Sequence, residues 1–163
     1  RAPLRSRALL SALLPSRQPL LAAVLLCTLW AGCEMTLYCA FRIATEVSRF
    51  GLPAVTLGYI PSAGGSQTLP RQVGQGIALG MVMTGEPIDA ERACALGLVN
   101  RVAAPEKLMD DALETAQKFA AIAPQAMAAT KTLFYRTLDL PFDQALEAGR
   151  ETNIRMRAFR KNE

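Results

Sequence analysis

The sequence predicts an α/β protein whose last third is helical. Two observations favour this class. Over residues 19–104, short apolar runs bounded by turn residues alternate with helix-forming stretches, and after residue 105 apolar residues recur at helical spacing between prolines. At 163 residues, of which 51% are hydrophobic and 20% charged, the chain is long enough for one ordinary domain with a buried core.

The first half is expected to contain three short strands and one helix. The apolar runs predicted as strands are Leu20–Leu26, Phe41–Ala44 and Val55–Leu57. A run as short as the first could also be a helix, because periodicity does not separate the two. Gly32–Ala40 is predicted to be helical with Glu34 in its first turn, where the helix dipole favours a negative charge. Phe50–Pro53 is expected to form a turn.

A glycine-rich loop, Gly58–Ser66, is predicted to lead into the next helix. Glycine lets the backbone approach a ligand closely, although a Gly-Gly pair by itself is more often a simple turn. The loop lacks the Lys of a phosphate-binding P-loop and the spacing of a dinucleotide fingerprint, which excludes both of these motifs.

Helix signals are clearest in the second half. Asp89 is a good N-cap for a helix over Ala90–Leu96, and Gly97 is a good C-terminal stop. Leu98–Val102 is predicted to be a short strand. The three helices expected after it are Glu106–Ala123, Gln125–Leu138 and Phe142–Phe159.

Charge and residue usage exclude several functions. The net charge of +4 comes from four arginines that precede the first acidic residue, so no basic face for nucleic acid is predicted. The chain has no histidine, which excludes Ser-His-Asp and Cys-His catalysis and every His-based metal site. Its four cysteines form no CxxC pair, and we expect them to be reduced and buried, with no metal site.

Residues 1–18 are predicted to be a basic leader of uncertain origin. They are rich in Arg, Ser and Leu and contain no acid, which is typical of a mitochondrial presequence. The apolar run after them also resembles a signal-peptide core, and residues 30–33 faintly resemble a lipoprotein cleavage site. The remaining interpretation is an unnatural leader joined to a truncated enzyme. The apolar run is too short to span a membrane. A cytoplasmic protein is expected, and the composition of residues 1–18 makes a mitochondrial one the alternative.

Glu34 is the first acidic residue of the chain, and it follows an uncharged run from Gln18 to Cys33. A carboxylate in such surroundings is costly to bury unless it is paired or protonated. Two interpretations remain open from the residues alone. Glu34 is either a structural carboxylate held by backbone N–H groups at a helix start, or an acid–base group of a desolvated site.

Several ordered motifs, in register, resemble one known family. They are Leu21–Val24, Gly32–Glu34, Phe41–Ala44, Arg49–Pro53, Leu57–Pro61, Gly64–Arg71, Thr84–Ala90 and Ala95–Asn100. From about Pro19 to Phe159 the chain resembles the crotonase superfamily, the enoyl-CoA hydratase/isomerase proteins, in an N-terminally truncated or divergent form. The resemblance implies a partial ββα spiral over residues 19–104 and a C-terminal helical trimerisation region over residues 105–163, hence a homotrimer or hexamer.

The resemblance also implies the chemistry of the site. The substrate would be an acyl-CoA thioester, with no further cofactor, and its thioester oxygen would be held by two backbone N–H groups. One of these matches Ala31, and the segment that should supply the other was not found. Glu34 matches one of two catalytic glutamates. The positions implied to bind substrate are Gly32, Ala54, Pro61, Ser62 and Gly64.

Two departures from the family pattern bear on activity. The second glutamate is expected directly after Pro53, where Ala54 stands, so a mechanism that needs two carboxylates is incomplete. Trp30 stands where the family tends to have glycine, and either narrows the site or packs against the core.

Three functions follow from these observations. The first is an enoyl-CoA hydratase or isomerase of the kind used in fatty acid β-oxidation, impaired by Ala54. The second is a non-catalytic crotonase-like subunit that serves assembly. The third, motivated only by the leader, is a secreted or lipid-anchored protein.

Overall fold

The computed structural model describes residues 16–160. Most of the predicted leader and the possible targeting signal therefore lie outside the described residues. Contacts divide the described residues into two compact units, Leu20–Ala116 and residues 117–160 together with Ser16–Pro19. The functional boundary at residue 105 stays a prediction. Each unit is described by itself.

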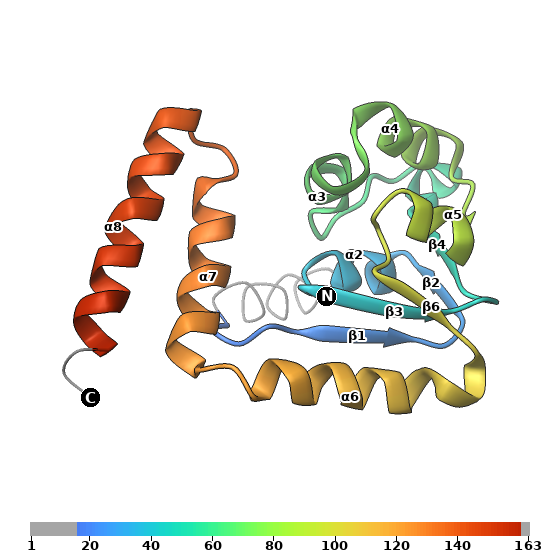
Figure 1. Ribbon diagram of the computed structural model, residues 1–163. Coiled ribbons are helices and arrows are strands. Elements are labelled where there is room, and N and C mark those ends of the chain that lie inside the picture. Colours follow the sequence, from blue (N-terminus) through green and yellow to red (C-terminus); the bar gives the residue numbers. More distant parts are fainter. Residues whose placement is uncertain (1–15, 161–163) are drawn as a thin grey trace. The chain divides into compact units, whose positions relative to one another are not determined.

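The first unit contains two three-stranded sheets (Figure 1). One is parallel, in the order β1 (Leu21–Val24), β3 (Phe41–Thr45) and β6 (Arg101–Ala103), with Leu21 opposite Phe41 and Ile43 opposite Arg101. The other has the order β2 (Cys27–Leu29), β4 (Arg49–Gly51) and β5 (Ile88–Asp89), with β2 and β4 parallel and β4 and β5 antiparallel. This mixed α/β architecture confirms the predicted fold class.

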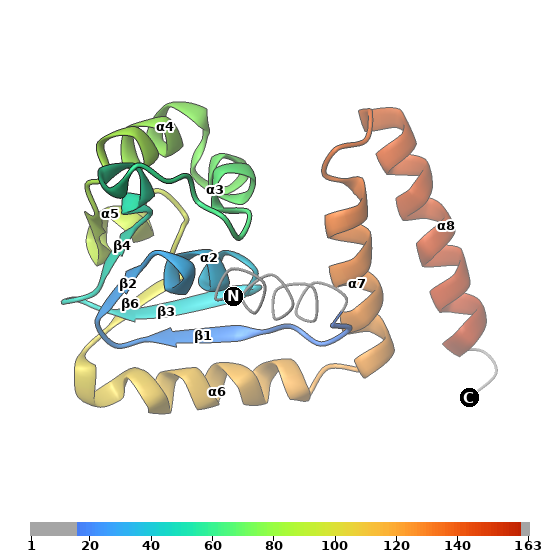
Figure 2. The same cartoon turned by 180° about the vertical axis from the view of Figure 1, so that it is seen from behind.

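Helices cover the first sheet on both sides. Helix α2 (Ala31–Leu37) lies on one side and α6 (Leu108–Ala120) on the other in both views (Figures 1 and 2). Ile43 packs with residues Ala103, Leu108 and Ala112 on the α6 side. On the other side a larger core joins α2 to three further helices: α3 (Gly65–Val73), α4 (Gln75–Thr84) and α5 (Ala90–Ala95). Burial of these apolar side chains is the main stabilising term.

Buried polar side chains hold the strand connections. The hydroxyls of Thr45 and Ser48 donate to the carbonyls of Leu25 and Val24 over 2.6 and 3.0 Å, which fixes the path from β1 to β2. The buried guanidinium of Arg42 donates to the carbonyls of Leu98, Thr36 and Cys39. A buried cation needs such partners because desolvation without them is costly.

The second unit consists of two helices, α7 (Pro124–Thr137) and α8 (Phe142–Arg160), which pack against each other. Pro124 occupies the first helical position of α7, where its missing N–H costs nothing. The Lys131 ammonium donates to the carbonyls of Ser16 and Gln18 over 2.8 and 2.9 Å. Within residues 16–160 no helix is long and apolar enough to cross a membrane.

Several sequence predictions are confirmed. The strands at β1 and β3, the helix at α2 with Glu34 in its first turn, and the three C-terminal helices are all present. Asp89 caps α5 by accepting the Arg92 N–H over 2.8 Å, and Gly97 follows it at φ 75°.

Other predictions are wrong. Within the turn expected at Phe50–Pro53, Phe50 and Gly51 belong to strand β4. Pro53 begins a 3₁₀ helix, η1 (Pro53–Leu57), which stands in place of the strand expected at Val55–Leu57. Pro53 sets the backbone for that helical turn, and Gly58 ends it at φ 73°.

The strand predicted at Leu98–Val102 begins only at Arg101. The N–H groups of Leu98 and Val99 instead donate to the Ala93 carbonyl over 2.9 and 3.1 Å and close the end of α5. Strands β2 and β5 and helix α4 were not predicted. A second 3₁₀ turn, η2 (Pro105–Lys107), precedes α6.

The cysteines only partly match expectation. None of the four, all of which are described, is in a disulfide, and Cys33 is buried, but Cys27 is exposed. Cys27 begins the short strand β2, whose side chains are not covered as a core strand would be.

Candidate active site

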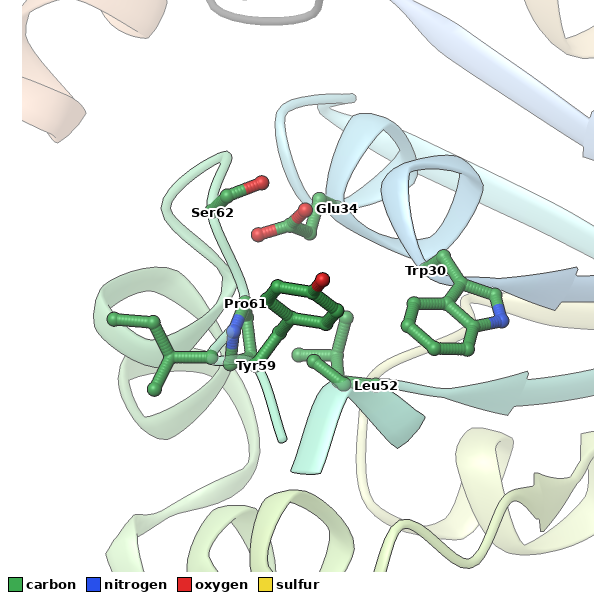
Figure 3. Close-up of a pocket in the computed structure, with 8 residues that line it drawn as sticks. Trp30, Glu34, Leu52, Tyr59, Pro61 and Ser62 are labelled. Atoms are coloured by element: carbon green, nitrogen blue, oxygen red, sulfur yellow. The ribbon is translucent and has the colours of Figure 1, made fainter. Parts of the chain in front are cut away.

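A cavity of about 320 Å³ lies in the first unit (Figure 3). Its walls come from the start of α2, the end of β4, η1 and the loop before α3. The lining residues are Trp30, Glu34, Leu52, Ala54, Tyr59, Ile60, Pro61 and Ser62. Most of this lining is apolar, which is typical of a small-molecule site with a few placed polar groups.

Helix α2 brings Glu34 into this cavity. The Glu34 N–H donates to the Trp30 carbonyl over 3.0 Å. This hydrogen bond closes the first turn of α2, so that Glu34 lies at the end of that turn. The side chain is 3% exposed, so the carboxylate lies in largely apolar surroundings. Figure 3 shows it projecting from the helix toward the loop that carries Ser62.

The two oxygens of Glu34 have different environments. Oε1 accepts the backbone N–H groups of Ala63 and Gly65, each over 2.8 Å. Within the described residues Oε2 accepts no hydrogen bond. The carboxylate is therefore held by one oxygen, which leaves the other available to a bound molecule. The hydrogen bonds confirm that backbone N–H groups hold the carboxylate, and the acid–base role of Glu34 stays a prediction.

The loop that holds Glu34 leaves no room for side chains. A Cβ at Gly65 would lie 2.9 Å from Glu34 Oε1 and 2.8 Å from Leu52 Cδ1. Gly64 has φ 90°, and a Cβ there would lie 2.3 Å from the Tyr38 hydroxyl. Tyr38 in turn donates to the Ala63 carbonyl over 2.9 Å. Glycine is needed at both positions for Glu34 to be held as it is.

Two neighbours of Glu34, the buried Cys33 and the partly buried Tyr38, stay protonated at neutral pH. Desolvation raises the pKa of the Cys33 thiol to about 12, and the Glu34 carboxylate adds to this rise. Desolvation, again helped by Glu34, also raises the pKa of Tyr38. Tyr38 therefore remains a hydrogen-bond donor to the loop at neutral pH, and Cys33 is an inert thiol rather than a nucleophile.

Trp30 immediately precedes α2 and has an unusual backbone. Its φ of 56° and ψ of −133° lie in a region that glycine favours, and it is the one non-glycine residue with positive φ in the described chain. Such a conformation costs about 1–3 kcal/mol for a residue with a side chain. One interpretation of the sequence expected the indole ring to pack against the core. The ring lines the cavity instead.

The predicted site residues are only partly brought together. Glu34, Ala54, Pro61 and Ser62 line the cavity, whereas Ala31, Gly32 and Gly64 do not. Ala31 is the first residue of α2, and its N–H has no acceptor among residues 16–160, so it is available to a ligand at the helix start. Gly32 is exposed, and Gly64 serves the loop that holds Glu34.

Sequence reasoning missed part of the site. Leu52, Tyr59 and Ile60 line the cavity, and Tyr38 and Gly65 support Glu34. No local pattern distinguishes these residues from core or surface ones, because their roles depend on contacts between distant segments. Ala54 is 5% exposed, and among residues 16–160 Glu34 is the only one with a carboxylate that lines the cavity.

The sequence of this chain is similar to those of known proteins. A family model described as enoyl-CoA hydratase/isomerase matches residues 4–161. The chain belongs to the enoyl-CoA hydratase/isomerase family. Among curated proteins it is 42% identical over 131 residues to a probable enoyl-CoA hydratase of Rhizobium meliloti (strain 1021), covering 80% of this chain and 51% of that protein. It is also 42% identical over 132 residues to the 2,3-dehydroadipyl-CoA hydratase of Escherichia coli (strain K12), covering 81% and 50%.

Solved structures of the family have the same fold. An enoyl-CoA hydratase of Bacillus anthracis superposes with a TM-score of 0.90 at 31% identity, over 99% of this chain and 66% of that one. One of Mycobacterium smegmatis gives 0.87 at 32% identity, over 93% and 58%. The chain spans about half the length of the curated relatives that it matches.

Proposed function

We propose that this protein is an enoyl-CoA hydratase-type enzyme that acts on acyl-CoA thioesters, with Glu34 as its acid–base group. The observation that carries the proposal is the unequal hydrogen bonding of the two oxygens of the Glu34 carboxylate. One oxygen is held by two backbone N–H groups, and the other is unbonded in an apolar cavity. A desolvated, fixed carboxylate with one open oxygen is suited to moving a proton of a bound water.

In hydration, a water oxygen bonds to the β-carbon of the enoyl group while one water proton passes to Oε2 of Glu34. The electron pair of the double bond moves toward the thioester oxygen, and in this proposal the N–H of Ala31 stabilises the charge that develops there. A proton must then reach the α-carbon. A second carboxylate would deliver it, but Ala54 stands at that position, so Glu34 has to return the proton itself.

Turnover of crotonyl-CoA tests this proposal, followed by the loss of enoyl-thioester absorbance. Three proteins are compared: the unaltered chain, Ala54→Glu and Glu34→Gln. We expect slow turnover by the unaltered chain and faster turnover by Ala54→Glu, because a general acid or base contributes about 10²–10⁴-fold. Glu34→Gln keeps an oxygen for the two N–H groups but cannot accept a proton, so it should be inactive.

The outcomes separate the alternatives. Activity that survives Glu34→Gln would remove Glu34 from the mechanism. No turnover by any of the three, with circular dichroism showing folded proteins, would favour the second candidate, a non-catalytic subunit. Ala54 and the ring of Trp30 in the cavity are the observations that favour that candidate.

The finer assignments rest on the family. We infer hydration of enoyl-CoA in fatty acid β-oxidation, without a cofactor, by a homotrimer or hexamer in the cytoplasm, with the mitochondrion as the alternative compartment. The substrate-binding positions proposed are Gly32, Ala54, Pro61, Ser62 and Gly64. The apolar side chains that α7 and α8 expose support the assembly.

A further inference from the structure

The backbone holds Trp30 in a conformation that its side chain does not explain. Its φ of 56° is the one positive value among the non-glycine residues of the described chain. The Trp30 N–H donates to the Gly51 carbonyl over 3.2 Å, and the Trp30 carbonyl accepts the Glu34 N–H over 3.0 Å. These two hydrogen bonds tie residue 30 to the end of β4 and to the first turn of α2. Strained residues persist where the surrounding structure fixes them, and they cluster at functional sites.

The side chain of Trp30 forms one wall of the cavity. The residue is 39% exposed, so its neighbours cover one part of it while the rest is open. Figure 3 shows the indole at one end of the lining and Ser62 at the other, with Glu34 between them. A glycine at position 30 would suit the backbone and would leave the space of the indole to a ligand.

Trp30 adjoins both groups of the proposed chemistry. Ala31, whose N–H has no acceptor among residues 16–160, is bonded directly to Trp30, and Glu34 lies one helical turn further along. An acyl group that accepts the Ala31 N–H and also reaches the open oxygen of Glu34 must lie within this short span. It shares the span with the indole, because residue 30 opens the same helical turn.

We infer that Trp30 is a specificity-determining residue, whose indole limits the acyl group to a short, slender chain of about crotonyl size and excludes bulky acyl groups. This inference rests on the proposed function and adds a size limit to it. The cavity of about 320 Å³ is at the small end for ligand sites. In an apolar pocket a single methylene changes the preference about 10–200-fold, so an acyl group that collides with the indole should be strongly disfavoured.

The test compares two saturated thioesters that differ in bulk, butanoyl-CoA and cyclohexylacetyl-CoA. Neither has a double bond to hydrate, so calorimetry reports binding alone. We expect the unaltered chain to bind butanoyl-CoA at least about tenfold more tightly than cyclohexylacetyl-CoA, which is the lower end of the range for one methylene. The chain has a single tryptophan, so its fluorescence reports independently whether a thioester reaches the cavity.

Variants assign the preference to the indole. Trp30→Gly removes the ring and suits the positive φ, so the affinity ratio should fall to near one through tighter binding of cyclohexylacetyl-CoA. Trp30→Phe keeps a ring and should keep most of the preference. Met83→Ala is the matched control, because it removes a large exposed side chain of α4 that does not line the cavity, and it should leave the ratio unchanged.

Trp30→Ala separates the ring from the backbone. It lacks the indole, so it should lose the preference as Trp30→Gly does. It retains a Cβ at positive φ, so its midpoint of urea denaturation should be lower than that of Trp30→Gly. Agreement of the two variants in binding, despite different stabilities, would assign the size limit to the ring itself.

The contrary results are distinct. Equal affinities in the unaltered chain, or a preference that persists in both Trp30→Gly and Trp30→Ala, would overturn the size limit, while turnover of crotonyl-CoA would still support the proposed function. Loss of all binding in a folded Trp30→Gly would show that the indole attracts the ligand rather than excludes it, which also overturns the limit. If neither saturated thioester nor crotonyl-CoA binds the folded unaltered chain, the size limit and the proposed function are both overturned.

Discussion

At the scale of single residues, Glu34 depends on neighbours that carry no chemistry themselves. Its Oε1 is held by two N–H groups of a loop that only glycine at positions 64 and 65 allows. The Tyr38 hydroxyl fixes the same loop through the Ala63 carbonyl. A small hydrogen-bond network thus sets the orientation of the Glu34 carboxylate. A substitution at one of the supporting residues, which take no part in the chemistry, should displace the carboxylate.

Gly65→Ala tests this dependence. The added methyl group would lie 2.8 Å from Leu52 Cδ1 and 2.9 Å from Glu34 Oε1, closer than atoms pack. We expect a loss of about 1–3 kcal/mol in the free energy of unfolding, as for other overpacked sites, measured by urea denaturation. Activity toward crotonyl-CoA should fall as well, because the carboxylate moves.

Gly80→Ala is the matched control for Gly65→Ala. Gly80 lies inside α4, has ordinary φ, and a Cβ there would meet nothing within 4 Å. Alanine in a helix is favoured over glycine by about 0.5–1 kcal/mol, so this variant should be slightly more stable. A Gly65→Ala protein as stable and active as the unaltered chain would show that the loop tolerates a side chain.

At the scale of elements, the caps decide where the short helices begin and end. Helix α5 has six residues, too few to be stable by itself, and it begins where the Asp89 carboxylate accepts the Arg92 N–H over 2.8 Å. Asp89 also belongs to β5, which pairs with β4 and places Asp89 opposite Arg49. Asp89 therefore connects the start of α5 to β4, the strand that is followed in sequence by the cavity residue Leu52.

Asp89→Ala should lower the free energy of unfolding by about 1 kcal/mol, because the cap is lost. The ion pair of Asp89 with Arg49, at 3.4 Å, is about half exposed and adds little. Asp89→Asn removes the charge but keeps an oxygen for the Arg92 N–H, so urea denaturation should place it near the unaltered chain. Equal losses in the two variants would assign the effect to the ion pair instead.

At the scale of the whole molecule, the C-terminal helices expose more apolar side chain than a pair of helices in water usually does. The exposed large apolar residues on α7 and α8 include Phe134, Phe142, Leu146, Ile154 and Phe159. Exposed apolar patches of this kind mark interaction sites. They are the structural basis for the proposed homotrimer.

Sedimentation equilibrium should therefore give about three times the chain mass of 17.6 kDa, or six times for a hexamer. Ile154→Glu, which places a charge where apolar surface is to be buried, should shift the distribution toward monomer. Asn153→Glu adds the same charge to an exposed neighbouring position and should have no such effect. A chain that stays monomeric at all concentrations would contradict the assembly.

The sequence by itself determined the family, the fold class and the elements with local signals. The capped helix α5, the amphipathic helices after residue 105 and the strands β1 and β3 all have hydrophobic spacing or end residues that act within a few positions. It also determined that Glu34 is unusual and that Ala54 breaks the family pattern, because both statements concern a residue and its near neighbours.

The tertiary structure alone decided how the site is built. The unequal hydrogen bonding of the two Glu34 oxygens, the support from Tyr38 and the position of Tyr59 in the cavity lining depend on segments up to 31 positions apart that meet only in the fold. The same is true of β4, which becomes a strand because β2 and β5 pair with it. Local patterns reflect local energies, whereas a cavity and its hydrogen bonds form only when distant segments pack together.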